Sequence, residues 1–249
     1  MVSVATEVRH PRFDERTSAL LLDIDGTLLD IAPTPESVSV PPELVRAIET
    51  IYERSSGAVA FVSGRQIEAM DRLFAPLILP AIGCHGGEIR AETMGAVQRQ
   101  VPLPDSVRQR ISDIVMKTQG VRVEDKGLSL ALHFRSAPEA GPELRRALER
   151  ERALLASADL VLLGGKSVIE IKPNWFNKGT GVADLLRRKP FSTRTPIFIG
   201  DDETDEDVIN LLQELGGTGY GVGRELPGAV FTFESPSHVR SWLGTLARG

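Results

Sequence analysis

The chain has 249 residues, of which 41% are hydrophobic and 25% are charged. This composition provides a full hydrophobic core for one large domain or two modest ones. The net charge of −5 argues against nucleic acid as a partner, because phosphate backbones select basic surfaces. Cys84 is the single cysteine, so an internal disulfide is excluded, and we expect a buried thiol in a reducing cytoplasm. No uncharged segment is long enough to span a bilayer, so no membrane partner is expected.

Two acids follow the first predicted strand. Residues 19–22 are apolar and predict a buried strand, after which come Asp23, Asp25 and the turn residue Gly26. Open α/β sheets bind ligands at the carboxyl ends of their strands. If strand alternation continues through Ile24, both carboxylates point the same way and repel each other, which indicates a bound cation or a shared proton. Taken alone, the segment is equally compatible with a plain acidic turn.

Helices and strands alternate in the first hundred residues and again after residue 173. The predicted elements are a loop over 31–40, a helix that begins at 41–43 and ends before Gly57, a strand over 58–62, a helix that ends at Phe74, a strand over 81–84, a helix over 178–188, strands over 196–199, 219–222 and 230–233, and a helix over 236–246. We expect Thr204 or Asp205 to cap a further helix that carries Val208 and Leu212. This alternation predicts a Rossmann-like α/β domain with a parallel sheet and helices on both faces.

The pattern differs between these two segments. We predict helices over 105–118 and 138–156, and two hairpins built from strands over 121–125, 129–134, 160–163 and 167–172. Helix–strand–strand, repeated twice, is typical of a small α+β module. Strand alternation turns apolar residues such as Val123 and Leu132 toward the helices and leaves a polar face of both charge signs, although such a face is often simply exposed. The expected organisation is a discontinuous core of residues 1–100 and 174–249 with a module of residues 101–173 inserted in it.

Polar side chains gather at one edge of the predicted parallel sheet. They follow the ends of three strands or begin a helix: Asp23, Asp25, Ser63, Lys178, Asp201, Asp202 and Asp205. Carboxylates without an accompanying His or Cys favour a hard cation, Mg²⁺ before Zn²⁺. A lysine and a serine suit an anion such as phosphate. A carboxylate that attacks a phosphate dianion is repelled by it, and each pair of unit charges costs about 4 kcal/mol at ~4 Å and an effective dielectric of ~20. Such an attack therefore needs both the divalent cation and Lys178.

Four segments, in order and context, resemble the four motifs of the haloacid dehalogenase-like phosphatases: 23–27, Ser63, Lys178 and 200–202. The resemblance implies that Asp23 is the nucleophile and becomes an aspartyl phosphate. It implies that Asp25 is the general acid for the leaving oxygen and then the base that activates water. Ser63, Gly64 and Lys178 are expected to bind the phosphoryl oxygens.

The same resemblance implies a Mg²⁺ site. The expected ligands are the side chain of Asp23, the main-chain carbonyl of Asp25 and the side chain of Asp201. Asp202 and Asp205 are expected to support these ligands. The fold implied is a haloacid dehalogenase-like core with an inserted α+β cap, which would lie over the crevice as a lid.

Further segments resemble those of the trehalose-6-phosphate phosphatases, over nearly the whole chain from Leu20 to Leu246: 83–86, 124–127, 133–135, 165–166, 170–173, 177–179 and 200–206. The resemblance implies that the lid binds the disaccharide through Glu124, Lys126, Arg135, Lys166 and Glu170. It leaves two roles open: His133 is a sugar contact or a packed strand residue, and Arg65 is a substrate contact or only a support of the Ser63 loop. At Val168 some relatives carry a polar residue, so one sugar contact is in doubt.

These resemblances imply a Mg²⁺-dependent phosphatase that hydrolyses trehalose 6-phosphate. Two alternatives stay open: the same chemistry on another phosphosugar, such as sucrose 6-phosphate or a glycosyl-glycerate phosphate, and a catalytically silent domain that binds a sugar phosphate. A mutase or phosphotransferase would need a second phosphate site, for which the lid offers no obvious extra basic cluster. Association with a trehalose-6-phosphate synthase is a further partnership that the resemblance leaves open.

Overall fold

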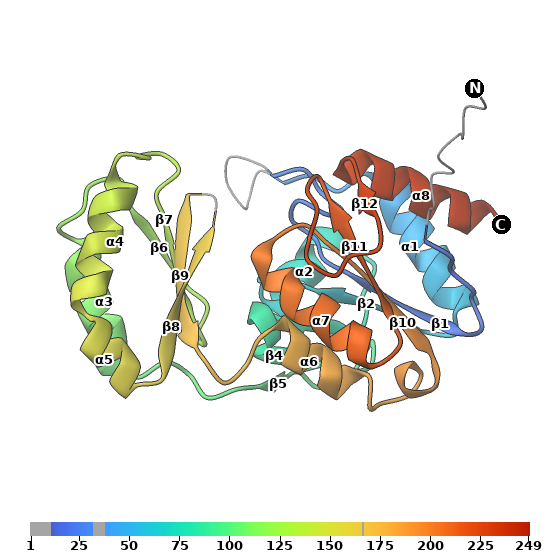
Figure 1. Cartoon of the computed structure of the whole chain (residues 1–249), viewed down its shortest axis with the longest axis horizontal. Helices are drawn as coiled ribbons and strands as arrows, with labels where there is room; N and C mark the ends of the chain where they lie inside the picture. The colour runs from blue at the N-terminus through green and yellow to red at the C-terminus, as the bar shows by residue number, and fades with distance from the viewer. Residues whose placement is uncertain (1–10, 32–37, 166) are drawn as a thin grey trace, which may run out of the picture. The chain divides into compact units, whose positions relative to one another are not determined.

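The computed structural model describes residues 11–31, 38–165 and 167–249, so most of the loop predicted over 31–40 lies outside the described residues. The chain divides into two compact units, one made of Met1–Val97 and Lys178–Gly249 and the other of Gln98–Asn177 (Figure 1). Each unit has hydrophobic clusters of its own. Across the described ranges, no helix combines the length and the apolar character needed to cross a lipid bilayer.

The first unit is built on a mainly parallel sheet. Its strands lie in the order β12-β11-β10-β1-β2-β3-β4, with β4 antiparallel to β3 and the other pairs parallel. The strands are β1 (Ser18–Leu22), β2 (Val59–Val62), β3 (Ala81–Gly83), β4 (Glu88–Arg90), β10 (Thr195–Gly200), β11 (Thr218–Val222) and β12 (Thr232–Phe233). The helices are α1 (Pro42–Arg54), α2 (Ile67–Phe74), α6 (Lys178–Leu185), α7 (Glu206–Glu214) and α8 (Pro236–Arg248), with short 3₁₀ helices η2 (Cys84–Gly86), η3 (Phe191–Thr193) and η4 (Glu203–Asp205). The strand β4, and β5 (Gln98–Arg99) at the start of the second unit, lie outside the elements predicted from the sequence.

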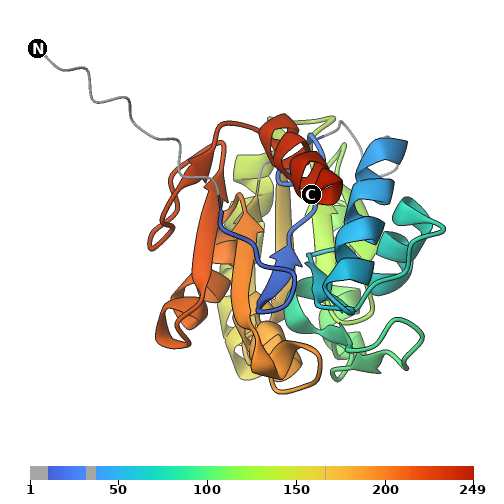
Figure 2. The same cartoon turned by 90° about the vertical axis from the view of Figure 1, so that its right-hand side faces the viewer.

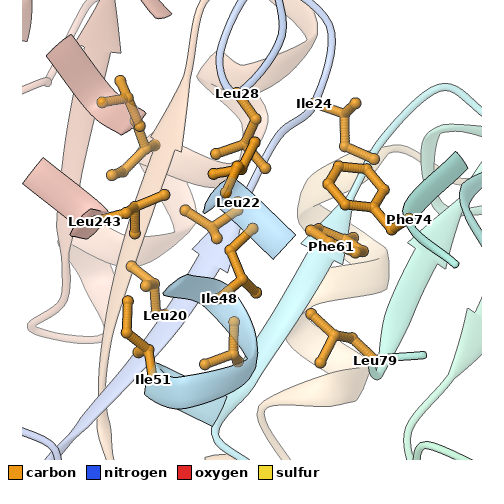
Figure 3. Close-up of a cluster of buried hydrophobic side chains, with 14 of the residues drawn as sticks. Leu20, Leu22, Ile24, Leu28, Ile48, Ile51, Phe61, Phe74, Leu79 and Leu243 are labelled. Atoms are coloured by element: carbon orange, nitrogen blue, oxygen red, sulfur yellow. The ribbon is translucent and has the colours of Figure 1, made fainter. Parts of the chain in front are cut away.

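Helices cover both faces of this sheet (Figure 2). Leu20 and Leu22 of β1 belong to one apolar cluster with residues of α1, α2 and α8 (Figure 3), whereas Leu21 belongs to a second cluster with residues of α6 and α7. Because both faces are covered, β1 and β2 are buried along their whole length, which explains their continuous apolar sequence. The predicted α/β class, with a parallel sheet between two layers of helices, is confirmed.

The end of β1 lies where the sequence predicts it, at Leu22 and before a turn that begins with Gly26. The strand ends at Leu22, and the amide of Leu28 then donates to the carbonyl of Ile24 at 2.9 Å. Asp25 then forms an isolated β-bridge with Leu29, and residues 26–28 make the turn between them. Asp23 and Asp25 therefore lie just past the strand, on either side of Ile24.

The second unit is a four-stranded antiparallel sheet, in the order β6-β7-β9-β8, packed on three helices. Its elements are α3 (Asp105–Val115), β6 (Arg122–Asp125), β7 (Leu130–His133), α4 (Ala140–Arg150), α5 (Arg152–Ser157), β8 (Leu160–Gly165) and β9 (Val168–Pro173). The single helix predicted over 138–156 is two helices that meet at Glu151. Val123 pairs with the buried Leu132 and so shares its face, as predicted, but it is 38% exposed because β6 is an edge strand.

A buried lysine holds the segment by which the chain leaves the second unit. Lys172 is 3% exposed, and its Nζ donates to the carbonyl of Pro173 at 2.6 Å and to the carbonyl of Phe176. The same ammonium lies 4.6 Å from the centre of the Phe176 ring, within range of a cation–π interaction. These contacts give the five residues before Lys178 a defined path.

Candidate active site

Neighbouring strands of the first unit end at one edge of its sheet. The strands β10, β1, β2 and β3 are adjacent and parallel. Just past β1 the amide of Asp23 donates to the carbonyl of Ile199 at 3.0 Å, and just past β2 the amide of Ser63 donates to the carbonyl of Ile82 at 2.9 Å. These bonds fix the backbone of Asp23 and Ser63 at neighbouring positions, and both residues are buried.

A buried ammonium group joins two of the predicted acids. Lys178 is the first residue of α6, and its Nζ donates to Oδ1 of Asp23 at 2.9 Å and to Oδ1 of Asp205 at 2.7 Å. The three side chains are at most 5% exposed. Charge-assisted hydrogen bonds in such surroundings are strong, and loss of one partner leaves a buried charge without compensation.

The charges of this cluster do not cancel. Burial raises the pKa of Asp23, Lys178 lowers it, and Asp205 and Asp201 raise it again, so that the pKa lies well above its ordinary value. Burial acts to lower the pKa of Lys178, but Asp205 and Asp23 raise it well above its ordinary value. One ammonium group therefore faces more carboxylate charge than it can neutralise. An additional cation would bring the pKa of Asp23 down and complete the balance.

Asp205 organises the loop that follows β10. Its Oδ1 accepts from Lys178, while its Oδ2 accepts from the amides of Asp201 at 2.9 Å and Asp202 at 3.1 Å. With both oxygens engaged, Asp205 supports the neighbouring acids. A Cβ on Gly200 would lie 2.4 Å from the Asp205 carboxyl group, so only glycine fits there.

The capping of this loop differs from the prediction. Oδ1 of Asp202 accepts from the amide of Thr204 at 2.9 Å and from its hydroxyl at 2.6 Å, and Asp202 thereby caps η4. Asp205 occupies the N-cap position of α7, but its side chain makes no capping bond there because it is turned to Lys178 and the loop amides. The expectation that the side chain of Thr204 or Asp205 caps α7 is therefore wrong. The capping carboxylate is that of Asp202, and it caps η4, the short helix that precedes α7.

Three carboxylates of this unit could hold a metal ion. Oxygens of Asp23, Asp201 and Asp205 lie within 4.8 Å of one another. The hydroxyl of Thr27 donates to Oδ1 of Asp201 at 3.4 Å, and Asp201 lies so close to Gly26 that a Cβ there would be 2.1 Å from its Oδ2. The donors are carboxylate oxygens with an excess of negative charge, which fits a hard divalent cation.

The side chain of Asp25 is bound by a different cation. Nε of Arg65 donates to Oδ2 of Asp25, and Nη2 donates to Oδ1, both at 2.6 Å. The amide of Arg65 donates to Oγ of Ser63 at 3.2 Å, which ties Arg65 to the loop after β2. The two acids that follow β1 thus bind different cations: Asp23 binds Lys178, and Asp25 binds Arg65.

The loop that carries Ser63 and Gly64 is packed against the turn after β3. The amide of His85 donates to the carbonyl of Ser63 at 3.1 Å, and the amide of Cys84 donates to the carbonyl of Arg65 at 2.8 Å. A Cβ on Gly64 would lie 2.4 Å from Nε2 of His85, so the ring covers this glycine. Cys84 is fully buried, as expected for a small apolar side chain.

In the second unit, most of the predicted sugar-binding residues form two hydrogen-bonded groups on one face of the sheet. Nε2 of His133 and Oε2 of Glu124 are 2.8 Å apart. Glu170 accepts from Nζ of Lys126 at 3.2 Å and from Oγ of Ser129 at 2.6 Å. The hydrogen bond with His133 lowers the pKa of Glu124, against the opposing effect of partial burial. This face offers the donors and acceptors that sugar hydroxyls require.

Two predicted residues fall outside these groups. Arg135 lies in the turn that follows β7 rather than in the strand, and Lys166 lies outside the described residues. Conversely, sequence reasoning misses Thr27 and Ser129 as partners of predicted site residues. Thr27 belongs to the segment that resembles the first phosphatase motif, which is a usable signal, whereas a lone serine before a strand, such as Ser129, gives none.

Comparisons with known proteins point to one family. The sequence model of the trehalose-phosphatase family matches residues 21–238. The chain is 38% identical to a probable trehalose-phosphate phosphatase of Sinorhizobium fredii, over 92% of this chain and 87% of that protein. It is 34% identical to the trehalose-6-phosphate phosphatase of Escherichia coli, over 90% of this chain and 85% of that protein.

Solved structures share the fold. The C-terminal domain of the trehalose-6-phosphate phosphatase of C. albicans matches with a TM-score of 0.82 at 21% identity, over 98% of this chain and 99% of that one. A haloacid dehalogenase-like hydrolase from Bacteroides thetaiotaomicron matches with a TM-score of 0.65 at 15% identity, over 93% of this chain and 100% of that one. The fold expected from the resemblance is confirmed. Since the family match extends over residues 21–238, the chain belongs to the trehalose-phosphatase family.

Proposed function

We propose that this protein hydrolyses trehalose 6-phosphate to trehalose and inorganic phosphate, with Mg²⁺ as its cofactor. The observation that carries the proposal is the buried group in which Lys178 binds Asp23 and Asp205 beside Asp201. The choice of substrate is supported by the family and by relatives at 38% and 34% identity that are named for this activity. The mixed-charge face of the second unit supports a sugar as the leaving group.

In the first step, Asp23 attacks the phosphorus of the substrate and becomes an aspartyl phosphate. Lys178 binds Oδ1 of Asp23 at 2.9 Å, so the carboxylate is already oriented. Each pair of unit charges that repel costs about 4 kcal/mol at ~4 Å and an effective dielectric of ~20. A Mg²⁺ ion held by Asp23, Asp201 and the main-chain carbonyl of Asp25 would supply positive charge against this repulsion. Ser63 and Gly64 bind the phosphoryl oxygens together with Lys178.

Asp25 moves the protons in both steps. Its carboxyl group gives a proton to the bridging oxygen while the phosphorus–oxygen bond of the substrate breaks, which releases trehalose as a neutral alcohol. Its carboxylate then takes a proton from the water that attacks the aspartyl phosphate. That attack breaks the bond between phosphorus and Asp23, releases inorganic phosphate, and returns both acids to their starting state.

The second unit selects the sugar. Glu124, Lys126, Glu170, Arg135 and Lys166 are the proposed contacts. A disaccharide presents hydroxyl groups that both donate and accept, so a face with carboxylates and cations satisfies more of them than an apolar face would. Binding energy from the sugar then helps to orient the phosphate for attack.

The test is phosphate release from purified protein on a panel of trehalose 6-phosphate, sucrose 6-phosphate, glucose 6-phosphate and an aryl phosphate, each with Mg²⁺ and with EDTA. We expect release from trehalose 6-phosphate that depends on Mg²⁺. It should fall at least about a thousand-fold in Asp23→Asn, because the nucleophile acts only in the chemical step. Glu170→Gln should lower kcat/KM for trehalose 6-phosphate and leave the aryl phosphate unaffected, with the exposed Glu143→Gln of the same unit as the matched control.

Each outcome separates a part of the proposal. Preference for another sugar would keep the chemistry and overturn the assigned substrate. Release that is insensitive to EDTA would contradict the cofactor. A folded protein that releases no phosphate from any member of the panel, but binds trehalose 6-phosphate, would show a silent binding domain.

A further inference from the structure

Arg65 makes a two-point contact with the side chain of Asp25. The Nε and Nη2 donors of the guanidinium group each bind a different carboxylate oxygen at 2.6 Å. The Arg65 side chain is 15% exposed, whereas that of Asp25 is 39% exposed. Paired donors of this kind fix the plane of a carboxylate as well as its position, which a single-point cation cannot do.

The position of Asp25 explains why such a contact matters. Asp25 lies between β1 and the turn of residues 26–28, and its backbone is held there: Asp25 forms a β-bridge with Leu29, and the amide of Gly26 donates to the carbonyl of Leu29 at 2.8 Å. The carboxylate group itself lies outside the acid cluster of Asp23, Asp201 and Asp205. A partly exposed aspartate has several accessible rotamers. A proton donor at this position therefore needs a neighbouring group that fixes the orientation of its carboxyl group.

We propose that Arg65 is a positioning residue that sets the orientation of Asp25 for proton transfer. This inference rests on the proposed function, which gives Asp25 the role of acid and base. Arg65 is itself anchored, since its amide donates to Oγ of Ser63 at 3.2 Å and its carbonyl accepts from Cys84 at 2.8 Å. Arg65 therefore belongs to the same hydrogen-bonded loop as Ser63, a proposed phosphate contact.

Arg65 can hold Asp25 through two oxygens or through one. As a carboxylate, it accepts from Arg65 with both oxygens. As an acid, one oxygen carries the proton and faces the bridging oxygen of the substrate, while the other still accepts from Arg65 and keeps the plane of the group. When the phosphorus–oxygen bond breaks, the proton passes to the leaving alcohol and the carboxylate is restored.

The test compares leaving groups. A sugar alkoxide must be protonated as it leaves, whereas a stable aryloxide leaves without help. Because kcat/KM reports the steps up to formation of the aspartyl phosphate, the general acid contributes to it only for the alkyl substrate. We expect Arg65→Gln to lower kcat/KM for the sugar phosphate by about ten- to a hundred-fold, the order expected when a reacting group is misplaced by about 1 Å. The value for the aryl phosphate should stay unchanged.

The second step provides an independent readout. With the aryl phosphate, Arg65→Gln should give a full initial burst of aryl alcohol and then a slow steady rate, because Asp25 is no longer aimed as the base for water attack. Asp25→Asn should show the same pattern more strongly, and the double variant should be no worse than Asp25→Asn alone. Arg65→Lys should recover only part of the loss, because lysine cannot bind both oxygens in one plane.

A second two-point arginine gives the matched control. Arg90 binds both oxygens of Asp71 at 2.6 Å in the same unit. We expect Arg90→Gln to lower stability and leave the ratio of the alkyl to the aryl kcat/KM values unchanged. If Arg65→Gln behaves like Arg90→Gln, with equal losses on both substrates, or if it has no effect on either, the positioning role is overturned.

Failure of the proposed function is distinguishable from failure of this inference. The alkyl substrate is whichever sugar phosphate the wild type hydrolyses best on the panel. If that is not trehalose 6-phosphate, the assigned substrate is wrong, and the comparison of leaving groups still decides the role of Arg65.

Discussion

At the scale of single residues, the main feature of the site is that its two neighbouring aspartates are bound by two different cationic side chains. Asp23 and Asp25 are two residues apart, but one is buried against Lys178 and the other is held by Arg65 at a partly exposed position. Because their partners and their exposure differ, the two carboxylates can serve different chemical roles although they are close in the sequence. A nucleophile benefits from burial near a cation, whereas a group that gives and takes protons needs contact with the substrate and with water.

Replacement of Lys178 by methionine tests the burial of the acid cluster. In Lys178→Met, Asp23 and Asp205 lose their ammonium partner, and we expect the free energy of unfolding at neutral pH to fall by about 3–5 kcal/mol. Without the ammonium the pKa of Asp23 rises further, so protonation of the folded state becomes favourable. The deficit should therefore be largest at neutral pH and should shrink as the pH falls and the buried acids take up protons.

Urea unfolding in EDTA at several pH values measures this. The exposed Lys117 provides the control, and Lys117→Met should change the free energy of unfolding by no more than about 0.5 kcal/mol. A pH-independent deficit in Lys178→Met would contradict the account, because it would mean that the acids are not the source of the loss.

Sequence reasoning identifies the residues of the site but not their pairing. Asp23, Lys178 and Asp201 can be predicted because each follows a strand or begins a helix, and parallel strands end at a common edge. The pairing of Asp25 with Arg65 cannot, because it joins two loops that are 40 residues apart in the sequence and leaves no local pattern.

At the scale of elements, α6 depends on a close approach to the turn after β3. A Cβ on Gly181 would lie 2.7 Å from the Ile82 side chain and 3.1 Å from the α-carbon of Gly86. Because α6 begins with Lys178, this contact also sets the position of the ammonium group. The helix carries glycine here for packing, against the ordinary preference of helices for alanine.

Two helical glycines therefore respond oppositely to the same substitution. We expect Gly181→Ala to lower the free energy of unfolding by about 1–3 kcal/mol through overpacking, and to lower kcat because Lys178 moves. In α8, a Cβ on Gly244 would meet only the end of Arg248 at 3.6 Å, so Gly244→Ala should stabilise by about 0.5–1 kcal/mol. Thermal and urea unfolding of both variants check the signs, and stabilisation by Gly181→Ala would contradict the packing argument.

The limits of prediction at this scale have physical causes. The helix predicted over 138–156 has no proline or glycine at its break, and the break coincides with Glu151, which accepts from Arg110 of α3 at 2.5 Å. Such a tertiary contact leaves no local pattern. The strand β4 has one apolar residue, Ile89, between Glu88 and Arg90, and so lacks the apolar run that reveals β1 and β2.

At the scale of the whole molecule, the two units have separate hydrophobic clusters. Leu22 is fully buried among residues of the first unit, and Leu132 is fully buried among residues of the second. Separate cores allow each unit to lose protection without the other.

Hydrogen exchange measures this independence. We expect Leu132→Ala to destabilise the second unit by about 2–5 kcal/mol and to speed exchange of amides in β7 and β9, while amides in β1 and β10 keep their protection. Leu22→Ala should show the reverse pattern. If either substitution speeds exchange equally in both units, the chain unfolds as one cooperative body and the separation is wrong.

The return of the chain into the first unit has an evolutionary consequence. The compact unit that Lys172 helps to close ends at Asn177, and the next residue is Lys178, whose ammonium group serves Asp23. Recombination at the 97/98 and 177/178 joints would exchange residues 98–177 as a block. In such chimeras the first unit would keep the lysine, serine and aspartates of its own site. Under the proposed function, exchange of the second unit during evolution would change the sugar preference, while the catalytic residues of the first unit stay the same.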